Sequence, residues 1–249
     1  YRHLLNQKDG KVTELTPPHD ILTKRIGEYL PGDPVLREMM VKSYDILKDH
    51  PVNVQRRAEG KNPANSAWFW GAGTRPALTS FEEKNGVKGA MISAVDLLKG
   101  IAAGSGMHNI IVDGANGGLH TNYSGKAQAA VKALTEDGYD FVYVHIEAPD
   151  EMGHQGSVKD KIKAIEYIDD QVIGPVAEKL RQSGVDFRML ILPDHPTPVR
   201  VRTHTSDPVP YLLYDSTEVQ EGCSTYCEKT GRESGKMLEE GYRLIDHLL

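Results

Sequence analysis

Short apolar runs alternate with amphipathic stretches from residue 79 to the end of the chain. The length and residue types of the apolar runs predict buried strands at 88–92, 109–112, 141–146, 189–192 and 209–214. Apolar residues at three- and four-residue spacing predict helices at 80–85, 95–103, 126–135, 158–181 and 233–249. Strands separated by helices form βαβ units. We therefore expect an α/β domain over residues 77–249, with a mostly parallel sheet and helices on both faces.

Residues 1–76 follow a different pattern. Apolar and polar positions alternate on both sides of the turn signal at 8–11, which predicts a hairpin. Helical spacing predicts a helix over 34–49, and the run at 52–57 predicts a strand after it. The consecutive aromatic residues at 68–70 indicate a further strand that crosses the molecule. Together these elements predict a second, smaller α+β domain that ends near residue 76.

Composition narrows the functional classes. The 249 residues carry a net charge of -6, so no basic surface indicates a nucleic-acid partner. No apolar run approaches the ~18–20 residues that a membrane span needs, and no signal peptide is evident. Cys223 and Cys227, the only two cysteines, are expected to be free thiols in a reducing compartment. We expect a cytoplasmic enzyme or binding protein.

Candidate metal ligands follow the predicted strand 141–146. Asp150 and His154 come directly after this strand, on what we expect to be a glycine-containing loop before the next helix. Ligands of open α/β sheets bind at the carboxyl ends of strands, where such a loop lies. A single pair of this kind is usually an ordinary surface feature, so the interpretation depends on whether the pattern recurs.

The pattern recurs after the predicted strand 189–192. Asp194 and His195 follow that strand, and His204 lies within ten residues of them. Carboxylates and imidazoles suit divalent ions such as Mn²⁺ and Zn²⁺. Five such ligands exceed the needs of one closed four-coordinate site. They suggest two adjacent ions, an arrangement that clamps the oxygens of a transferring phosphoryl group.

Three stretches carry a resemblance to a known family: Asp-Glu-Met-Gly-His-Gln-Gly at 150–156, Pro-Asp-His-Pro-Thr-Pro at 193–198, and Arg-Thr-His-Thr-Ser-Asp-Pro-Val-Pro at 202–210. Their order resembles that of the archaeal-type, cofactor-independent phosphoglycerate mutases of the alkaline phosphatase superfamily. Further matches lie at 61–71 and 92–101. The resemblance implies an alkaline-phosphatase-like α/β fold over 77–249, with residues 1–76 as the remnant of an inserted domain on the substrate side.

The resemblance also implies an activity. Enzymes of this family interconvert 3-phosphoglycerate and 2-phosphoglycerate in glycolysis and gluconeogenesis, through a metal-activated Ser or Thr phosphoenzyme. They need two divalent ions (Mn²⁺, Zn²⁺ or Mg²⁺) and no 2,3-bisphosphoglycerate. By resemblance, Asp150, His154 and His204 would hold one ion, while Asp194 and His195 would belong to the second.

The family's amino-terminal portion carries a further metal-binding Asp and the nucleophilic Ser or Thr, and neither has a counterpart in this sequence. We therefore expect the phosphatase-like domain to be incomplete on its amino-terminal side, with no catalytic nucleophile of its own and no turnover by this chain alone. An absent strand would leave its neighbour unpaired and apolar surface exposed, which favours association. A homo-oligomer therefore stays open.

Four residues are candidates for binding a small phosphorylated substrate. The guanidinium of Arg75 suits a phosphate, and Lys99 resembles a family lysine near the phosphate. Asn122 could line the site and His19 could face substrate from the inserted domain. The first three also have an ordinary structural interpretation: a surface Arg, a solvated Lys at a helix end and a turn Asn. His19 follows two prolines and precedes Asp20.

Two alternative functions remain open. The ligand set alone also fits a metal-dependent phosphatase or phosphopentomutase of the same superfamily, although residues 1–76 favour the mutase. A non-catalytic, metal-binding chain is the alternative from another class. Assays on 3-phosphoglycerate and on p-nitrophenyl phosphate would distinguish the two enzymes.

Overall fold

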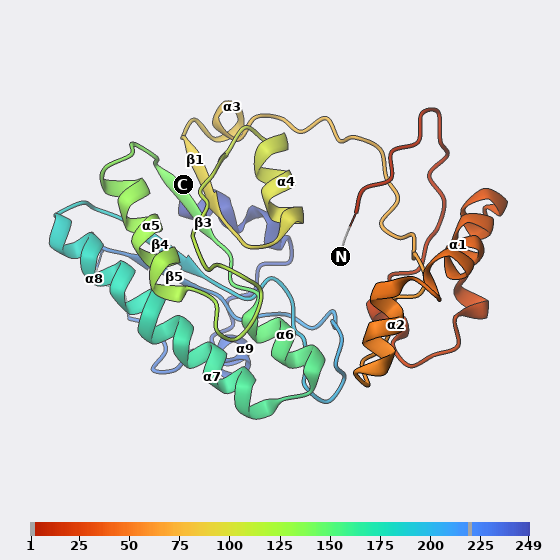
Figure 1. The fold of residues 1–249 in the computed structure, drawn as a ribbon. Coiled ribbons are helices and arrows are strands. Elements are labelled where there is room, and N and C mark those ends of the chain that lie inside the picture. Colours follow the sequence, from red (N-terminus) through yellow and green to blue (C-terminus); the bar gives the residue numbers. More distant parts are fainter. Residues whose placement is uncertain (1–2, 219–220) are drawn as a thin grey trace. The chain divides into compact units, whose positions relative to one another are not determined.

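The computed structural model describes residues 3–218 and 221–249 (Figure 1). The chain forms two compact units, Tyr1–Pro76 and Ala77–Leu249. No helix in the two described ranges is long and apolar enough to cross a lipid bilayer.

The amino-terminal unit is built on two helices, α1 (Pro34–Leu47) and α2 (Pro51–Ala58), preceded by short 3₁₀ turns at Pro18–Ile21 and Ile26–Tyr29. Asp33 caps α1, since its carboxylate accepts hydrogen bonds from the backbone N–H groups of Val35 and Leu36 at 2.9 Å. Pro34 occupies the first turn, where its missing N–H costs nothing. The helix predicted over 34–49 is confirmed.

The prediction of strands in this unit is wrong. Residues 3–76 contain no strand, although the expected turn at Lys8 and Asp9 does form. The run at 52–57 is helical because Pro51 starts α2 at its first position and His50 caps it. The aromatic segment 68–70 pairs with no strand. Instead the indole N–H of Trp68 donates to the carbonyl of Thr16 at 2.8 Å.

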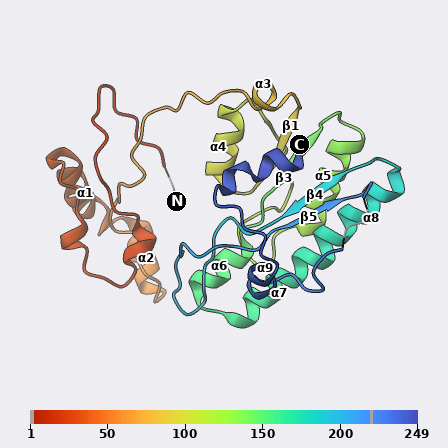
Figure 2. The ribbon, with the colours of Figure 1, turned by 180° about the vertical axis from the view of Figure 1, so that it is seen from behind.

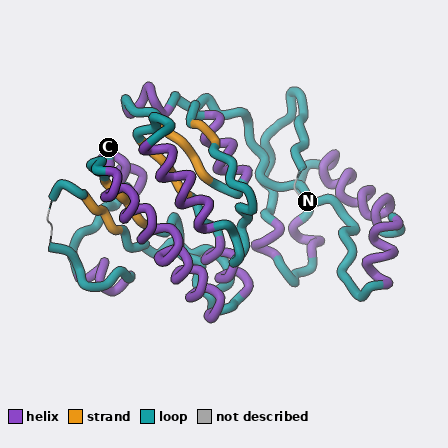
Figure 3. The backbone as a smooth tube through the Cα atoms, turned by 60° about the vertical axis from the view of Figure 1, so that its left-hand side comes forward, coloured by secondary structure: helices purple, strands orange, loops and turns teal. Residues whose placement is uncertain are grey.

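The carboxy-terminal unit contains a parallel sheet with strand order β2-β1-β3. Its strands are β1 (Gly89–Ile92), β2 (His108–Asn109) and β3 (Phe141–Val144). Helix α4 (Asp96–Gly104) contacts β1 and β2, and α5 (Tyr123–Thr135) contacts β1 and β3. Figure 3 shows the strands lying between helices. The predicted α/β class with a parallel sheet is confirmed.

A second, two-stranded sheet is antiparallel. It pairs β4 (Arg188–Ile191) with β5 (Leu212–Asp215), which lie side by side in Figure 2. The expected strand at 109–112 is shorter than predicted, because only His108 and Asn109 pair with β1. The remaining helix before the sheet is α3 (Phe81–Asn85), which confirms the helix predicted at 80–85 and is capped by Ser80.

Two long helices expected from the sequence are divided. The stretch 158–181 forms α7 (Val158–Ile168), a π-helical turn (Asp169–Ile173) and α8 (Gly174–Ser183). Proline at position 175 has no N–H to continue the α-helical ladder, which favours such a turn. The stretch 233–249 contains only the last residue of α9 (Glu228–Glu233), then a 3₁₀ turn (Gly241–Leu244) and α10 (Ile245–Leu248), and Gly235 follows α9 with a φ of 68°.

The core of this unit gathers buried side chains from α5, α7, α8 and the helix that follows β3, α6 (Ala148–Gln155). Ala148 and Met152 of α6 pack with Tyr123 and Ala127 of α5. The opposite face of α6, which carries Asp150 and His154, is left at the edge of this core. The packing therefore fixes the position of the candidate ligands.

Candidate metal centre

Asp150 and His154 lie on α6 and not on the loop that the sequence predicted. Pro149 does not interrupt the helix but occupies its first turn. Gly156 ends the helix with a φ of 74°. Residues four apart on a helix share one face, so both side chains point the same way. The helix holds the two ligands at a fixed spacing, which favours a metal site more than a loop would.

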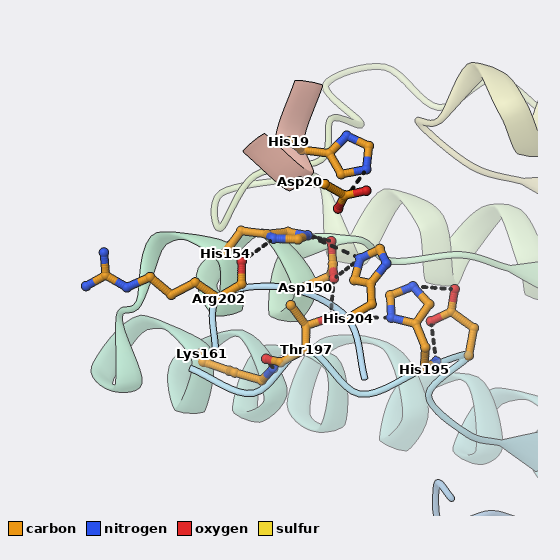
Figure 4. Close-up of polar contacts among 10 residues, drawn as sticks. His19, Asp20, Asp150, His154, Lys161, His195, Thr197, Arg202 and His204 are labelled. Atoms are coloured by element: carbon orange, nitrogen blue, oxygen red, sulfur yellow. Dashed lines mark hydrogen bonds and ion pairs between the residues drawn. The ribbon is translucent and has the colours of Figure 1, made fainter. Parts of the chain in front are cut away.

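His204 completes a cluster with these two residues, although it is 50 positions from His154. Its Nε2 lies 3.3 Å from Oδ1 of Asp150, and Nε2 of His154 lies 3.3 Å from Oδ2 of the same carboxylate. The two Nε2 atoms are 3.2 Å apart. One ligand atom from each of the three residues lies within 4.8 Å of the others (Figure 4). We call this cluster the Asp150 set.

The hydrogen bond of His154 defines its tautomer. Its Nδ1 lies 2.9 Å from the carbonyl oxygen of Arg202, which can only accept. Nδ1 therefore carries the proton, and in a neutral imidazole Nε2 holds a lone pair. This lone pair faces the Asp150 carboxylate, another acceptor. Nε2 of His204 also lies 3.2 Å from Nε2 of His154, and one carboxylate and two imidazole nitrogens that converge in this way suit a divalent ion. The Asp150 set thus fits a metal.

Arg202 has a backbone conformation that serves this contact. Its φ is 59°, in the left-handed region that non-glycine residues seldom occupy. Such strain persists only where the surroundings impose it. A Cβ at Gly156 would lie 2.5 Å from Nε of Arg202, so the absence of a side chain at Gly156 lets the arginine pass over the end of α6.

Asp194 and His195 form a neighbouring pair rather than part of the Asp150 set. Oδ2 of Asp194 lies 3.4 Å from Nε2 of His195, and its Oδ1 accepts from the backbone N–H of His195 at 3.1 Å. The imidazole rings of His195 and His204 lie 3.9 Å apart, centre to centre. The structure thus brings all five predicted ligands into one neighbourhood but lets the ligand atoms of only three converge.

The substrate-binding candidates have structural contacts of their own. Lys99 pairs with Asp96 on the same helix at 3.3 Å. Asn122 caps α5, since its side chain accepts from the N–H of Gly125 at 2.8 Å and donates to the carbonyl of Asp113 at 2.8 Å. In the amino-terminal unit, the ring of His19 packs edge-on against Trp70, and Arg75 is exposed. Their roles toward a substrate stay predictions.

Three residues near the ligands were missed at the sequence level: Lys126, Lys161 and Thr197. Lys126 is 1% exposed, and its Nζ donates to the carbonyl of His145 at 2.9 Å, just after β3 ends. Burial lowers the pKa of Lys126 to about 8, and the negative charge of Glu147 partly opposes this shift. Because lysines are seldom buried, a lysine in an amphipathic helix is expected to face solvent. The helical pattern of α5 therefore gives no sign that Lys126 is buried.

A sequence profile described as the metalloenzyme superfamily matches residues 18–239. The chain belongs to this superfamily. That assignment agrees with the metal-ligand chemistry of the Asp150 set.

Individual relatives show which members of the superfamily the chain is similar to. The chain is 47% identical over 256 aligned positions to a protein of Methanosarcina barkeri named 2,3-bisphosphoglycerate-independent phosphoglycerate mutase; the alignment covers all of this chain and 64% of that protein. It is 45% identical to a probable enzyme of the same name from Geobacter sulfurreducens, covering all of this chain and 63% of the relative. The resemblance seen in the motifs is confirmed, and the chain spans less than two thirds of these relatives.

Solved structures agree. The PH0037 protein of Pyrococcus horikoshii matches with a TM-score of 0.66 and 34% identity, over 80% of this chain and 51% of that one. A cofactor-independent phosphoglycerate mutase of Thermoplasma acidophilum matches with a TM-score of 0.51 and 28% identity, over 88% of this chain and 53% of that one. These matches confirm the alkaline-phosphatase-like fold expected from the sequence.

Proposed function

We propose that this chain forms the metal-binding, carboxy-terminal part of a phosphoglycerate mutase that interconverts 3-phosphoglycerate and 2-phosphoglycerate without 2,3-bisphosphoglycerate. The observation that carries the proposal is the convergence of the Asp150 set at 3.2–3.3 Å, in a chain whose curated relatives are named as such mutases. A glycolytic role of this kind would be exercised in the cytoplasm.

The residues have distinct tasks in this proposal. Asp150 supplies the anionic ligand, while His154 and His204 supply neutral nitrogen ligands. The Arg202 carbonyl keeps the proton of His154 on Nδ1, so Nε2 stays available. Asp194 and His195 would contribute to a second ion beside the first. Divalent ions at such a site polarise phosphoryl oxygens and lower the pKa of a bound hydroxyl.

Substrate contacts belong to the same proposal. Lys99, Asn122, Arg75 and His19 are the candidates to meet the phosphate or the carboxylate of the phosphoglycerate. Their cationic and hydrogen-bonding groups suit such an anion. Lys99 would have to leave Asp96 to do so, which exposed ion pairs permit at little cost.

The test is an assay on the complete natural protein that contains this sequence. We expect conversion of 3-phosphoglycerate to 2-phosphoglycerate with no 2,3-bisphosphoglycerate added, loss of activity on chelation, and recovery with Mn²⁺, Zn²⁺ or Mg²⁺. Hydrolysis of p-nitrophenyl phosphate at a higher rate than the mutase reaction would instead favour a phosphatase. The 249-residue chain, assayed alongside, tests the prediction that it lacks the nucleophile.

A further inference from the structure

Thr197 lies between the two groups of ligands. Its side chain is buried, with 3% of the residue exposed, in the segment that follows Asp194 and His195. Its hydroxyl donates to Oδ1 of Asp150 and lies 3.3 Å from Nδ1 of His195 (Figure 4). A hydroxyl has one hydrogen and two lone pairs. Since the hydrogen points to the carboxylate, a hydrogen bond between Thr197 and His195 requires the proton on Nδ1 of His195, whose Nε2 lies 3.4 Å from Oδ2 of Asp194.

The backbone at Thr197 is held from the other side. Its carbonyl accepts from Nζ of Lys161 on α7 at 2.7 Å. Helix α6 approaches the same carbonyl at Gly153, where an added Cβ would lie 2.5 Å from the oxygen. Two helices therefore fix this residue by contacts that leave its hydroxyl free to join Asp150 to His195.

We propose that Thr197 is a positioning residue that sets the spacing between the Asp150 set and the Asp194–His195 pair. The hydroxyl orients the carboxylate of Asp150 and keeps the proton of His195 on Nδ1, so Nε2 of His195 carries the lone pair. This proposal rests on the proposed function, since spacing matters only if both groups bind ions. Groups that orient metal ligands typically change affinity by about 10- to 100-fold when removed.

The first experiment needs no metal. Nitrogen-15 NMR of the histidine rings in the metal-free chain, at pH 8, reports which nitrogen of His195 carries the proton. We expect Nδ1–H in the wild type and in Thr197→Ser, which keeps the hydroxyl. In Thr197→Val, Nδ1 loses its acceptor, and we expect the proton to move to Nε2, 3.4 Å from the Asp194 carboxylate. An unchanged tautomer in Thr197→Val would overturn the proposal.

The second experiment measures Mn²⁺ and Zn²⁺ binding to the same chain by calorimetry. We expect Thr197→Val to bind about 10-fold more weakly and Thr197→Ser to stay within about two-fold of the wild type. Lys161→Met releases the carbonyl of Thr197 and should weaken binding about three-fold by the same logic, although it also removes a positive charge that acts on Asp150. Lys159→Met, at an exposed position of the same helix, is the matched control and should have no effect.

The two experiments distinguish a failure of the positioning role of Thr197 from a failure of the proposed metal centre. Equal weakening in Thr197→Val and Thr197→Ser would assign the effect to packing and overturn the positioning role. A wild-type chain that binds neither ion would refute the metal centre of the proposed function. The tautomer of His195 would still decide whether Thr197 positions that ring.

Discussion

The two groups of candidate ligands differ in how the fold supports them. Asp150 and His154 project from one helix whose other face is packed into the core of the unit. Asp194 and His195 lie in a segment without regular secondary structure between β4 and β5. The first group gathers three ligand atoms within 4.8 Å with His204, whereas the second offers two.

This difference predicts two ion sites of unequal strength. Three protein ligands that converge before any ion binds lose little conformational freedom on binding, so their site should be the tighter one. A pair of ligands leaves most of the coordination to water or to other groups, and its ion should be held weakly. Variants of the two groups, and of the residues that support them, test whether the sites differ in this way.

The largest effect is expected for Asp150→Asn. Asp150 contacts both histidines of its set and Thr197, and it carries the set's negative charge. Since removal of an outer partner already costs 10- to 100-fold, loss of this ligand should weaken Mn²⁺ binding about 1,000-fold. Calorimetry measures the change. Glu151→Gln, which removes the neighbouring charge on α6, is the control; an equal loss there would mean that net charge alone attracts the ion.

The buried Lys126, which donates to the carbonyl of His145 between β3 and α6, gives the next prediction. Lys126 has a folded-state pKa of about 8, below its ordinary value of 10.5. Between these values the unfolded chain binds more protons than the folded one, so the free energy of unfolding should rise with pH from 8 to 10.5. Each pKa unit is worth 1.36 kcal/mol, which makes the full rise on the order of 3 kcal/mol.

Urea unfolding at several pH values measures this rise. Lys126→Met should lose it, because methionine does not titrate. Lys132→Met, on the exposed side of α5, should keep it and serves as the control. All titrating groups other than Lys126 are common to the wild type and Lys126→Met and cancel in that comparison. Parallel pH profiles for the wild type and Lys126→Met would show that the pKa of Lys126 is not lowered in the folded chain.

Gly153 gives a smaller effect. In Gly153→Ala the new Cβ would meet the carbonyl oxygen of Thr197 at 2.5 Å, so α6 and the Thr197 segment must move apart. Overpacking of this kind typically costs about 1–3 kcal/mol. At Gly100, within α4, an added Cβ meets nothing within 4 Å. Gly100→Ala should therefore stabilise by about 0.5–1 kcal/mol. Denaturant unfolding of both variants would reveal opposite signs, and equal signs would contradict the close approach.

The alternating strands and helices, and helix α6 among them, show what sequence patterns can and cannot predict in this chain. The alternation of strands and helices after residue 79 depends on local spacing, and the parallel sheet follows from it. Helix α6 was taken for a loop because Pro149 and Gly153 usually interrupt structure. Pro149 instead begins the helix, and Gly153 is needed where another backbone comes close. The presence of a single proline or glycine does not show whether that residue ends a helix, begins one or allows another backbone to come close.

The site was predictable only in part, for the same reason. The five ligand residues follow from motif order and strand ends. Thr197 and Lys126 act through partners 47 and 19 positions away, and their own neighbours in the sequence contain no sign of this. The strand predicted at 52–57 was wrong for the same reason. The side-chain amide of Asn53 donates to the carbonyls of Leu47 and Ala64, so contacts with residues outside the run support a helix there.

Asp194→Asn should have the smallest effect on the tighter ion. The Asp194 carboxylate contacts His195 and lies outside the converging set, so binding at the Asp150 set should weaken no more than about three-fold, the scale of a lost neighbouring charge. Asp207→Asn removes the same charge from the same segment, where Asp207 accepts only from Thr205 among its described contacts, and is the matched control. A loss in Asp194→Asn comparable to that in Asp150→Asn would mean that one ion spans both groups. The contrast between a tight set and a weak pair would then have to be abandoned in favour of a single five-ligand centre.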